Sequence, residues 1–326
     1  MKKISVLVFE DAVGSAVIGT LEILSAVNQF LAQKGKEAPF TIETIGISAR
    51  EVPLSIGTTV YCDRSMDETE RIDLIVVPAF NGNPEDMLRK YDKVVPWLNR
   101  MYDRGSELAS MCLGAFFLAA TGLLDGKSCT THWMGMEEMS RLFPQVQLNP
   151  DQIVTDQDGI YTSGGAYSSL NLIIYLVDKF CSREASIWAS KFFAIDMGRD
   201  SQAPFFIFNN QKKHEDELIE KVQMYIEANY SQILVVEELA NRFGVSQRNF
   251  IRRFKKATRN TPLQYIQRVR IEAAKKELEQ GMQSLSDVMF SIGYSDMKSF
   301  REMFKRITGI TPSEYRRKYN RVDCGS

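Results

Sequence analysis

Cys112 is the residue that type and spacing place best for covalent chemistry. It follows the predicted strand 106–111 and precedes Leu113-Gly114-Ala115, so this strand is expected to end, and a helix to begin, at the thiol. A side chain on such a turn projects above the sheet, and the N–H groups beyond it point toward the same space. The partial positive charge of a helix N-terminus favours the thiolate. His132, twenty residues further on, offers an imidazole partner.

Two interpretations of Cys112 remain open at this point. A free cysteine often serves as a small buried apolar residue, and spacing alone favours this packing role. In the second interpretation the imidazole of His132 assists a thiolate nucleophile. The chain has only two histidines, His132 and His214, and no Cys-x-x-Cys pair. No metal-ligand pattern is therefore present, and we expect neither a metal nor another cofactor.

The elements that position these residues belong to a chain of 326 residues, which is long enough for two domains. Hydrophobic residues make up 44% and charged residues 25%, values that exclude a disordered chain and supply two cores. Five scattered cysteines indicate a reducing compartment rather than a disulfide framework. No apolar run approaches the roughly 18 residues of a membrane span, and no secretory signal is evident. We therefore expect a cytoplasmic protein with no membrane partner.

The first two-thirds of the chain alternates between strand-like and helix-like segments. Short runs rich in apolar and β-branched residues, which fit strands buried on both faces, occupy residues 4–9, 40–47 and 73–77, and further strands are expected over 106–111 and 160–162. Helix-like segments occupy residues 16–31, 94–102, 116–121 and 167–180, and the last of them is amphipathic. This alternation predicts an α/β domain with a mostly parallel sheet.

Four motifs in this region resemble the class I glutamine amidotransferase-like domain of the DJ-1/PfpI type, in the version fused to AraC-type regulators (GlxA-like regulators). They are Ser110-Met111-Cys112-Leu113-Gly114-Ala115, Gly122-Leu123-Leu124-Asp125-Gly126, Thr130-Thr131-His132-Trp133 and Tyr161-Thr162-Ser163-Gly164-Gly165. The resemblance covers about residues 1–195 and implies a flavodoxin-like fold for a sensor or dimerisation domain over residues 1–197. It also implies that Cys112 is the elbow cysteine and His132 its downstream histidine.

The acidic position of that family departs from the pattern. Ala16 stands where Asp or Glu is usual, and Asn171 stands where the regulators often have Asp. Without the carboxylate, no group is in place to orient a proton near the thiol. This argues against a working hydrolase and for a ligand pocket on an enzyme scaffold. The expected pocket residues are Ala16, Gly82, Cys112, Leu113, His132 and Trp133, with Gly82 either offering a backbone N–H to an anionic group or serving as a turn glycine.

Charge and repetition set the last third apart. Residues 231–326 carry 19 Lys and Arg against 10 Asp and Glu, whereas residues 1–230 carry 21 against 31. A basic end on an acidic body indicates a polyanionic partner, most often nucleic acid. Periodicity is interrupted from 198 to 204, so we expect a linker over 198–213, an all-α domain over 214–320 and a tail over 321–326.

The basic region contains a duplicated motif. Positions 239, 240, 244 and 246 correspond to 288, 289, 293 and 295, and seven residues recur identically 50 positions later: Phe250, Phe254, Lys255, Thr258, Thr261, Pro262 and Tyr265. Each copy predicts a helix-turn-helix, with Gly244 or Gly293 in the turn and Ser246 or Ser295 as the N-cap. A connecting helix over 263–279, about 26 Å long, would space the two recognition helices about one DNA turn apart.

The repeat closely resembles the AraC family DNA-binding domain over about residues 215–320. The matching segments are Glu238-Leu239-Ala240, Gly244-Val245-Ser246, Phe250-Ile251-Arg252-Arg253-Phe254-Lys255-Lys256, Ile292-Gly293-Tyr294-Ser295, Phe300-Arg301-Glu302-Met303-Phe304-Lys305 and Thr311-Pro312-Ser313-Glu314-Tyr315-Arg316. Outward residues expected to meet DNA bases are Gln247, Arg248, Ile251, Arg252, Asp296, Met297, Lys298 and Arg301. Residues expected to meet phosphates are Lys255, Lys256, Arg259, Lys305, Arg306, Arg316 and Arg317.

The sequence therefore predicts a one-component transcription regulator that binds double-stranded DNA. Its expected partners are an unidentified small-molecule effector and a second copy of the chain in a homodimer, with RNA polymerase as a further candidate. Two alternatives stay open for the first domain: a Cys112-dependent amidase or glyoxalase-like enzyme, and a redox sensor in which Cys112 is oxidised reversibly.

Overall fold

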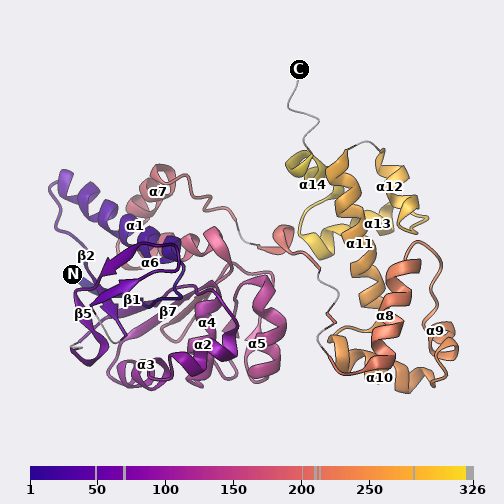
Figure 1. Cartoon of the computed structure of the whole chain (residues 1–326). Helices are drawn as coiled ribbons and strands as arrows, with labels where there is room; N and C mark the ends of the chain where they lie inside the picture. The colour runs from indigo at the N-terminus through magenta and orange to yellow at the C-terminus, as the bar shows by residue number, and fades with distance from the viewer. Residues whose placement is uncertain are drawn as a thin grey trace. The chain divides into compact units, whose positions relative to one another are not determined.

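The computed structural model of the chain describes residues 1–47, 50–68, 71–199, 201–208, 211–212, 214–281 and 283–320 (Figure 1). These residues form two compact units that divide between Gln202 and Ala203. Within the expected linker, Gln202 belongs to the first unit, whereas Phe208 is buried in a core cluster of the second. The expected tail, residues 321–326, lies outside the described residues.

The first unit is built on a seven-stranded sheet with the strand order β10-β11-β7-β6-β1-β2-β5. Its strands are β1 (Lys2–Val8), β2 (Phe40–Gly46), β5 (Arg64–Ser65), β6 (Leu74–Val77), β7 (Glu107–Met111), β10 (Val154–Gln157) and β11 (Ile160–Ser163). Every neighbouring pair is parallel except β10 and β11. The predicted mostly parallel α/β fold is thus confirmed. Two further strand pairs are β3 (Glu51–Pro53) with β4 (Thr59–Tyr61) and β8 (Ser128–Cys129) with β9 (Gln147–Leu148).

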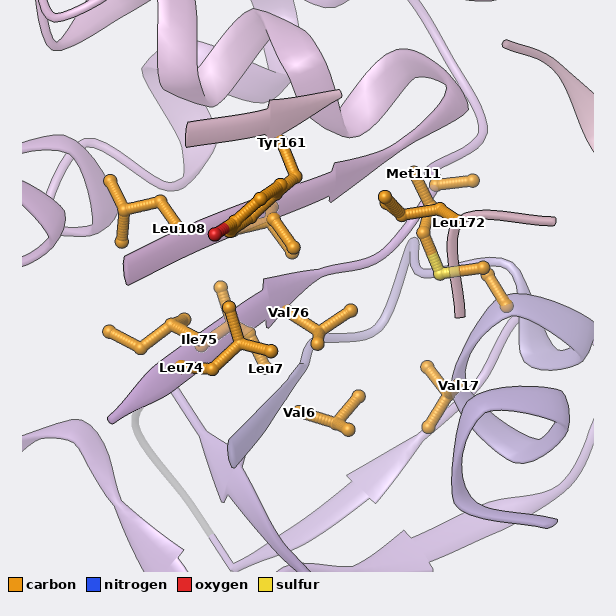
Figure 2. Close-up of a cluster of buried hydrophobic side chains, with 14 of the residues drawn as sticks. Val6, Leu7, Val17, Leu74, Ile75, Val76, Leu108, Met111, Tyr161 and Leu172 are labelled. Carbon is orange, nitrogen blue, oxygen red and sulfur yellow. The ribbon is translucent and has the colours of Figure 1, made fainter. Parts of the chain in front are cut away.

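Helices cover both faces of this sheet, which explains why its central strands β1, β6 and β7 are almost wholly buried. The helices are α1 (Gly14–Gln33), α2 (Pro84–Lys90), α3 (Val94–Asp103), α4 (Ala115–Ala120), α5 (Met136–Leu142), α6 (Leu170–Phe180) and α7 (Arg183–Phe192). In Figure 1, α1, α6 and α7 lie on one side of the sheet, and α2, α3 and α4 lie on the other. Figure 2 shows Val6, Val76 and Leu108 of three neighbouring strands in the buried cluster that α1 joins through Val17.

α1 is long and apolar enough, by length and composition, to cross a membrane. In this fold it is instead the crossover between the paired strands β1 and β2, and Val17, Ile23, Leu24 and Val27 on one of its faces are buried in the core. A core helix of this kind resembles a membrane span in length and composition because both bury apolar side chains.

The second unit is all helical. It contains α8 (Glu217–Asn229), α9 (Val236–Arg242), α10 (Gln247–Thr258), α11 (Pro262–Gln280), α12 (Leu285–Ser291), α13 (Met297–Thr308) and α14 (Pro312–Tyr319). α9 with α10, and α12 with α13, are the two predicted helix-turn-helix pairs. α11 joins them and contributes Tyr265 and Ile266 to one core cluster and Ile271 and Leu278 to another.

The sequence repeat reappears as repeated contacts. Gly244 and Gly293 both have positive φ, +69° and +83°, at the turn of each pair. Tyr265 and Tyr315, which are 50 positions apart, each donate a hydrogen bond from the phenol to a glutamate, over 2.7 Å and 2.6 Å respectively. The duplication therefore includes buried polar contacts as well as apolar positions.

Two predicted helix starts are wrong. Ser295 is not the N-cap of the second recognition helix; Asp296 caps it, because its carboxylate accepts from the N–H of Ser299 over 2.6 Å. The helix expected from Tyr167 begins at Leu170, after a 3-10 turn over Ala166–Ser169 in which Ala166 has φ +51°.

Candidate nucleic-acid interface and cysteine elbow

Cys112 lies at a sharp turn where β7 ends and the chain enters α4 through a 3-10 turn. Its φ is +56°, a left-handed conformation that costs a non-glycine residue about 1–3 kcal/mol. Gly114 makes the turn possible, because a Cβ there would lie 2.5 Å from the carbonyl oxygen of Pro78, just after β6. The predicted elbow is therefore present, with the backbone strain that a nucleophile elbow carries.

The thiol is not held as a thiolate. The Cys112 side chain is buried, with the residue only 7% exposed, and this burial raises the pKa of the thiol. Backbone N–H groups of Ala166 and Leu113 donate toward the sulfur and lower the pKa, but desolvation outweighs them. The expectation that the helix N-terminus lowers this pKa is thus wrong in net effect, because the sulfur is withdrawn from water.

His132 lies close to the same turn. Thr131, the residue before it, donates from its hydroxyl to the carbonyl oxygen of Cys112 over 2.8 Å. The Nδ1 atom of His132 accepts from the N–H of Met134 over 3.1 Å, so the neutral ring carries its proton on Nε2. Burial lowers the pKa of the imidazole, which favours this neutral form. Gly165 lies flat against the ring, where a Cβ would stand 1.7 Å from Cδ2.

The other predicted pocket positions are placed as follows. Ala16 is buried on α1, and its carbonyl accepts from Thr20, whose hydroxyl also contacts the sulfur of Met111 beside the elbow. Gly82 has φ +114°, so it serves as a turn glycine whatever else it does. Trp133 lies next to His132, with ring centroids 5.2 Å apart.

Asn171 lies elsewhere, lining a hollow of about 370 Å³ with Asp178 and Arg199. Gln202, which no sequence motif indicated, is also part of the elbow region. Its carboxamide NH₂ donates to the carbonyl of Thr131 over 3.0 Å, and its oxygen accepts from the N–H of Gly165 over 3.4 Å. The contact spans 71 positions along the chain, so no local pattern marks it.

In the second unit, α10 is oriented by its cap and its aromatic face. Ser246 accepts from the N–H of Asn249, as predicted, and Phe250 and Phe254 are fully buried. Gln247, Arg248 and Arg252 are exposed on the opposite side, whereas Ile251 is half-buried. A groove of about 430 Å³ runs along this helix and is lined by Arg248, Ile251, Arg252, Lys255, Lys256 and Arg259.

α13 repeats the arrangement with differences. Phe300 and Phe304 are buried, and Lys298, Arg301, Lys305 and Arg306 are exposed. Met297 packs partly against the core. Asp296 directs its carboxylate to the N-terminus of its own helix, which lowers the pKa of that carboxyl. On α14, Arg317 is exposed, but Nε and Nη2 of Arg316 are buried without a hydrogen-bond partner among the described residues.

Residues 2–179, more than half of the chain, match the model of the DJ-1/PfpI family. The chain belongs to the DJ-1/PfpI family. Residues 239–318 match the model described as a helix-turn-helix domain. This DJ-1/PfpI protein therefore carries a helix-turn-helix domain after its family domain, as its repeat predicted.

Two relatives match most of the chain. The HTH-type transcriptional regulator GbdR of Pseudomonas aeruginosa is 25% identical over 92% of this chain and 80% of its own length. The HTH-type transcriptional regulator GlxA of Rhizobium meliloti is 27% identical over 82% of each chain. The crystal structure of an AraC family transcriptional regulator from Pseudomonas putida is similar in fold, with a TM-score of 0.52 and 18% identity. The match covers 59% of this DJ-1/PfpI protein and 100% of the Pseudomonas putida chain.

Proposed function

We propose that this protein is a sequence-specific DNA-binding transcription regulator. The observation that carries the proposal is the groove along α10, which five basic side chains line together with Ile251. A second helix in the same repeat, α13, exposes four more basic residues. The two relatives described above are both transcriptional regulators of the helix-turn-helix type by name.

On both recognition helices, the type of each exposed residue decides whether we assign it to a base or to a phosphate. Arginine pairs with guanine and glutamine with adenine in the major groove, so we assign base contacts to Gln247, Arg248 and Arg252 with apolar support from Ile251. On α13 the corresponding assignments are Asp296, Met297, Lys298 and Arg301. Phosphate contacts, which supply affinity without sequence choice, are assigned to Lys255, Lys256, Arg259, Lys305, Arg306, Arg316 and Arg317.

The test uses the double variant Arg248→Ala with Arg252→Ala in the full chain. A duplex selected from a random library by the wild type serves as the probe, and fluorescence anisotropy measures its Kd against random competitor. We expect at least a tenfold loss for the selected duplex, since each base-reading arginine is worth about 1–3 kcal/mol. Arg89→Ala, an exposed arginine on α2, is the matched control. Unchanged selectivity in the double variant would remove the proposal.

For the first unit we propose a ligand pocket rather than an active site. Ala16 supplies no carboxylate, Nδ1 of His132 is occupied by a backbone N–H, and burial raises the pKa of the Cys112 thiol. None of these three groups is therefore poised to take up or release the thiol proton. Ligand binding around Cys112, His132 and Trp133 would act on DNA affinity by favouring one of two states. Equal operator affinities at zero and saturating ligand would leave the unit as a dimer scaffold.

The remaining partners belong to the same proposal. A homodimer would present two copies of the repeat to one operator, and sedimentation equilibrium at micromolar concentration tests it through the measured mass. The cytoplasm is the proposed location because DNA and RNA polymerase, the further candidate partner, are found there. Retention of polymerase by the chain on its selected duplex, and not on a scrambled one, tests that contact.

The left-handed backbone at Cys112 favours a second candidate, a Cys112-dependent amidase or glyoxalase-like activity, because strained elbows commonly hold nucleophiles. That candidate predicts turnover that Cys112→Ala abolishes while DNA binding persists. A redox sensor instead predicts a peroxide-dependent change in DNA affinity that Cys112→Ser removes. If neither the wild type nor Cys112→Ala shows turnover, and peroxide leaves the DNA affinity of the wild type unchanged, both Cys112-dependent candidates are excluded.

A further inference from the structure

Gln202 is anchored beside the cysteine elbow at the last position of the first unit. The residue is 2% exposed, and its carboxamide bonds to Thr131, Gly165 and the hydroxyl of Thr130. Its own N–H donates to the carbonyl of Asp151 over 3.0 Å. Because a buried amide that loses its partners costs about 1–3 kcal/mol, the side chain holds the chain firmly at this point.

The segments that hold Gln202 are also those that hold the elbow. Thr131 accepts from Gln202 with its carbonyl and donates to the carbonyl of Cys112 with its hydroxyl. Gly165 donates to Gln202, and the next residue, Ala166, donates toward the Cys112 sulfur. An atom added at the elbow, from a ligand or on the sulfur, would therefore press on backbone that also contacts Gln202.

Residues 203–208, which we name the strap, directly follow Gln202 and are docked within the second unit. The carbonyl of Phe206 accepts from Nζ of Lys275, a lysine only 4% exposed on α11. Glu272 accepts both from the N–H of Phe208 over 3.2 Å and from Lys275 over 2.9 Å. The ring of Phe208 packs edge-on against Tyr265, with centroids 5.3 Å apart.

The strap also reaches the second helix-turn-helix pair. The carbonyl of Pro204 accepts from the phenol of Tyr319 at the end of α14, and Lys318 lies over the ring of Phe205. The turn Ala203–Phe205 contacts α13, the second recognition helix. One peptide bond thus separates an anchor at the elbow from a segment docked on the DNA-binding repeat.

We propose that Gln202 and the strap form a tether through which the state of the cysteine elbow sets DNA affinity. The effect of the tether on DNA affinity rests on the proposed function, whereas the coupling between Gln202 and the strap does not. Release of Gln202 frees the start of the strap, and release of the strap from Lys275 frees Gln202, because coupling between two sites is reciprocal.

The first experiment perturbs each anchor in the full chain and follows backbone hydrogen exchange by mass spectrometry. Gly164→Ala pushes against the Gln202 side chain, since the added Cβ would lie 2.9 Å from Oε1 of Gln202. The backbone at Gly164 is not left-handed, so the alanine adds no conformational strain of that kind. Gln202→Ala removes the anchor, and Lys275→Met loosens the strap from the other side. Gln145→Ala, an exposed glutamine of the first unit, is the control.

We expect Gly164→Ala and Gln202→Ala each to speed exchange across residues 203–208, and Lys275→Met to speed exchange at residues 164–166. The double variant Gly164→Ala with Gln202→Ala is expected to show the same exchange rates as Gln202→Ala alone, because the added methyl group then has no carboxamide to contact. Exchange that changes only within the mutated unit would overturn the tether. If Gln202→Ala unfolds the first unit, Lys275→Met still decides the outcome from the second.

The second experiment measures Kd for the duplex selected by the wild type. Gln202→Ala is expected to shift this Kd at least about fivefold, the lower end of ordinary allosteric coupling, while Gln145→Ala leaves it unchanged. Exchange changes with an unchanged Kd would overturn the proposal that the tether sets DNA affinity. A wild type that selects no duplex would instead refute the proposed function, and the exchange data would still judge the tether.

Discussion

The two turn glycines of the repeat predict unequal costs for the same substitution. Gly244 and Gly293 occupy equivalent positions and have φ of +69° and +83°. Alanine in this left-handed region costs roughly 1–2 kcal/mol at either site. Among the described residues, a Cβ at Gly244 meets nothing within 4 Å, whereas one at Gly293 would lie 2.5 Å from the carbonyl oxygen of Ser231. The second site therefore carries a steric cost in addition to the conformational one.

The neighbour of Gly293 cannot easily retreat. Arg270 donates to the carbonyls of Tyr230 and Gln232, each over 2.8 Å, and so fixes the backbone on both sides of Ser231. Forcing extra volume into such a packed place costs typically about 1–3 kcal/mol. We thus expect Gly244→Ala to lower the free energy of unfolding of the second unit by about 1–2 kcal/mol, and Gly293→Ala by about 2–5 kcal/mol.

Hydrogen exchange is the suitable assay for this pair. All three tryptophans, Trp97, Trp133 and Trp188, lie in the first unit, so their fluorescence does not report on the second. The slowest-exchanging amides of α11 give the unfolding free energy of the second unit directly in the full chain. A cost for Gly244→Ala equal to or larger than that for Gly293→Ala would refute the reasoning.

Three further predictions concern protonation and helix ends. Arg253 holds the pKa of Asp216 below its ordinary value, so their pairing stabilises the second unit fully above about pH 4, and this stabilisation is lost as the pH falls through the lowered pKa of the folded state. Asp216→Asn should therefore weaken the loss of stability at acid pH, measured by hydrogen exchange, and an unchanged loss would contradict this. Ser246→Ala and Asp296→Ala should each cost about 1 kcal/mol of unfolding free energy in the same measurement, because each removes an N-cap; a cost near zero would show that the cap is unimportant. Iodoacetamide at pH 7 should label Cys112 far more slowly in the folded chain than in urea, since burial raises the thiol pKa, and equal rates followed by mass spectrometry would contradict that burial.

The sequence predicted the central strands well because their burial is local information. β6 is four consecutive buried residues, Leu74–Val77, and such a run has few alternatives. The edge strand β10, Val154–Gln157, was missed because two of its four side chains are exposed polar groups without a strand-like pattern. Only its antiparallel pairing with β11 makes it a strand, and pairing between segments is not visible in a short window.

The candidate sites were predictable where one residue type dictates the geometry. Cys112 and His132 were found by motif, and Gly244 by its turn. The choice between Ser295 and Asp296 as N-cap was not, because both residue types cap helices and only the backbone path decides which one does. The direction of the Cys112 pKa also depended on burial, which is a property of the whole first unit rather than of the motif.

α11 serves as a common axis for both halves of the repeat, and this limits how the protein can change over evolutionary time. Adding one residue to a continuous helix rotates everything after it by about 100° and moves it by about 1.5 Å. Insertion of a single residue into α11 would therefore rotate the second recognition helix, α13, away from its face of the double helix. The spacing between the two DNA segments that α10 and α13 contact is therefore expected to stay constant among descendants. New target sequences are instead reached by substitutions of side chains on α10 and α13.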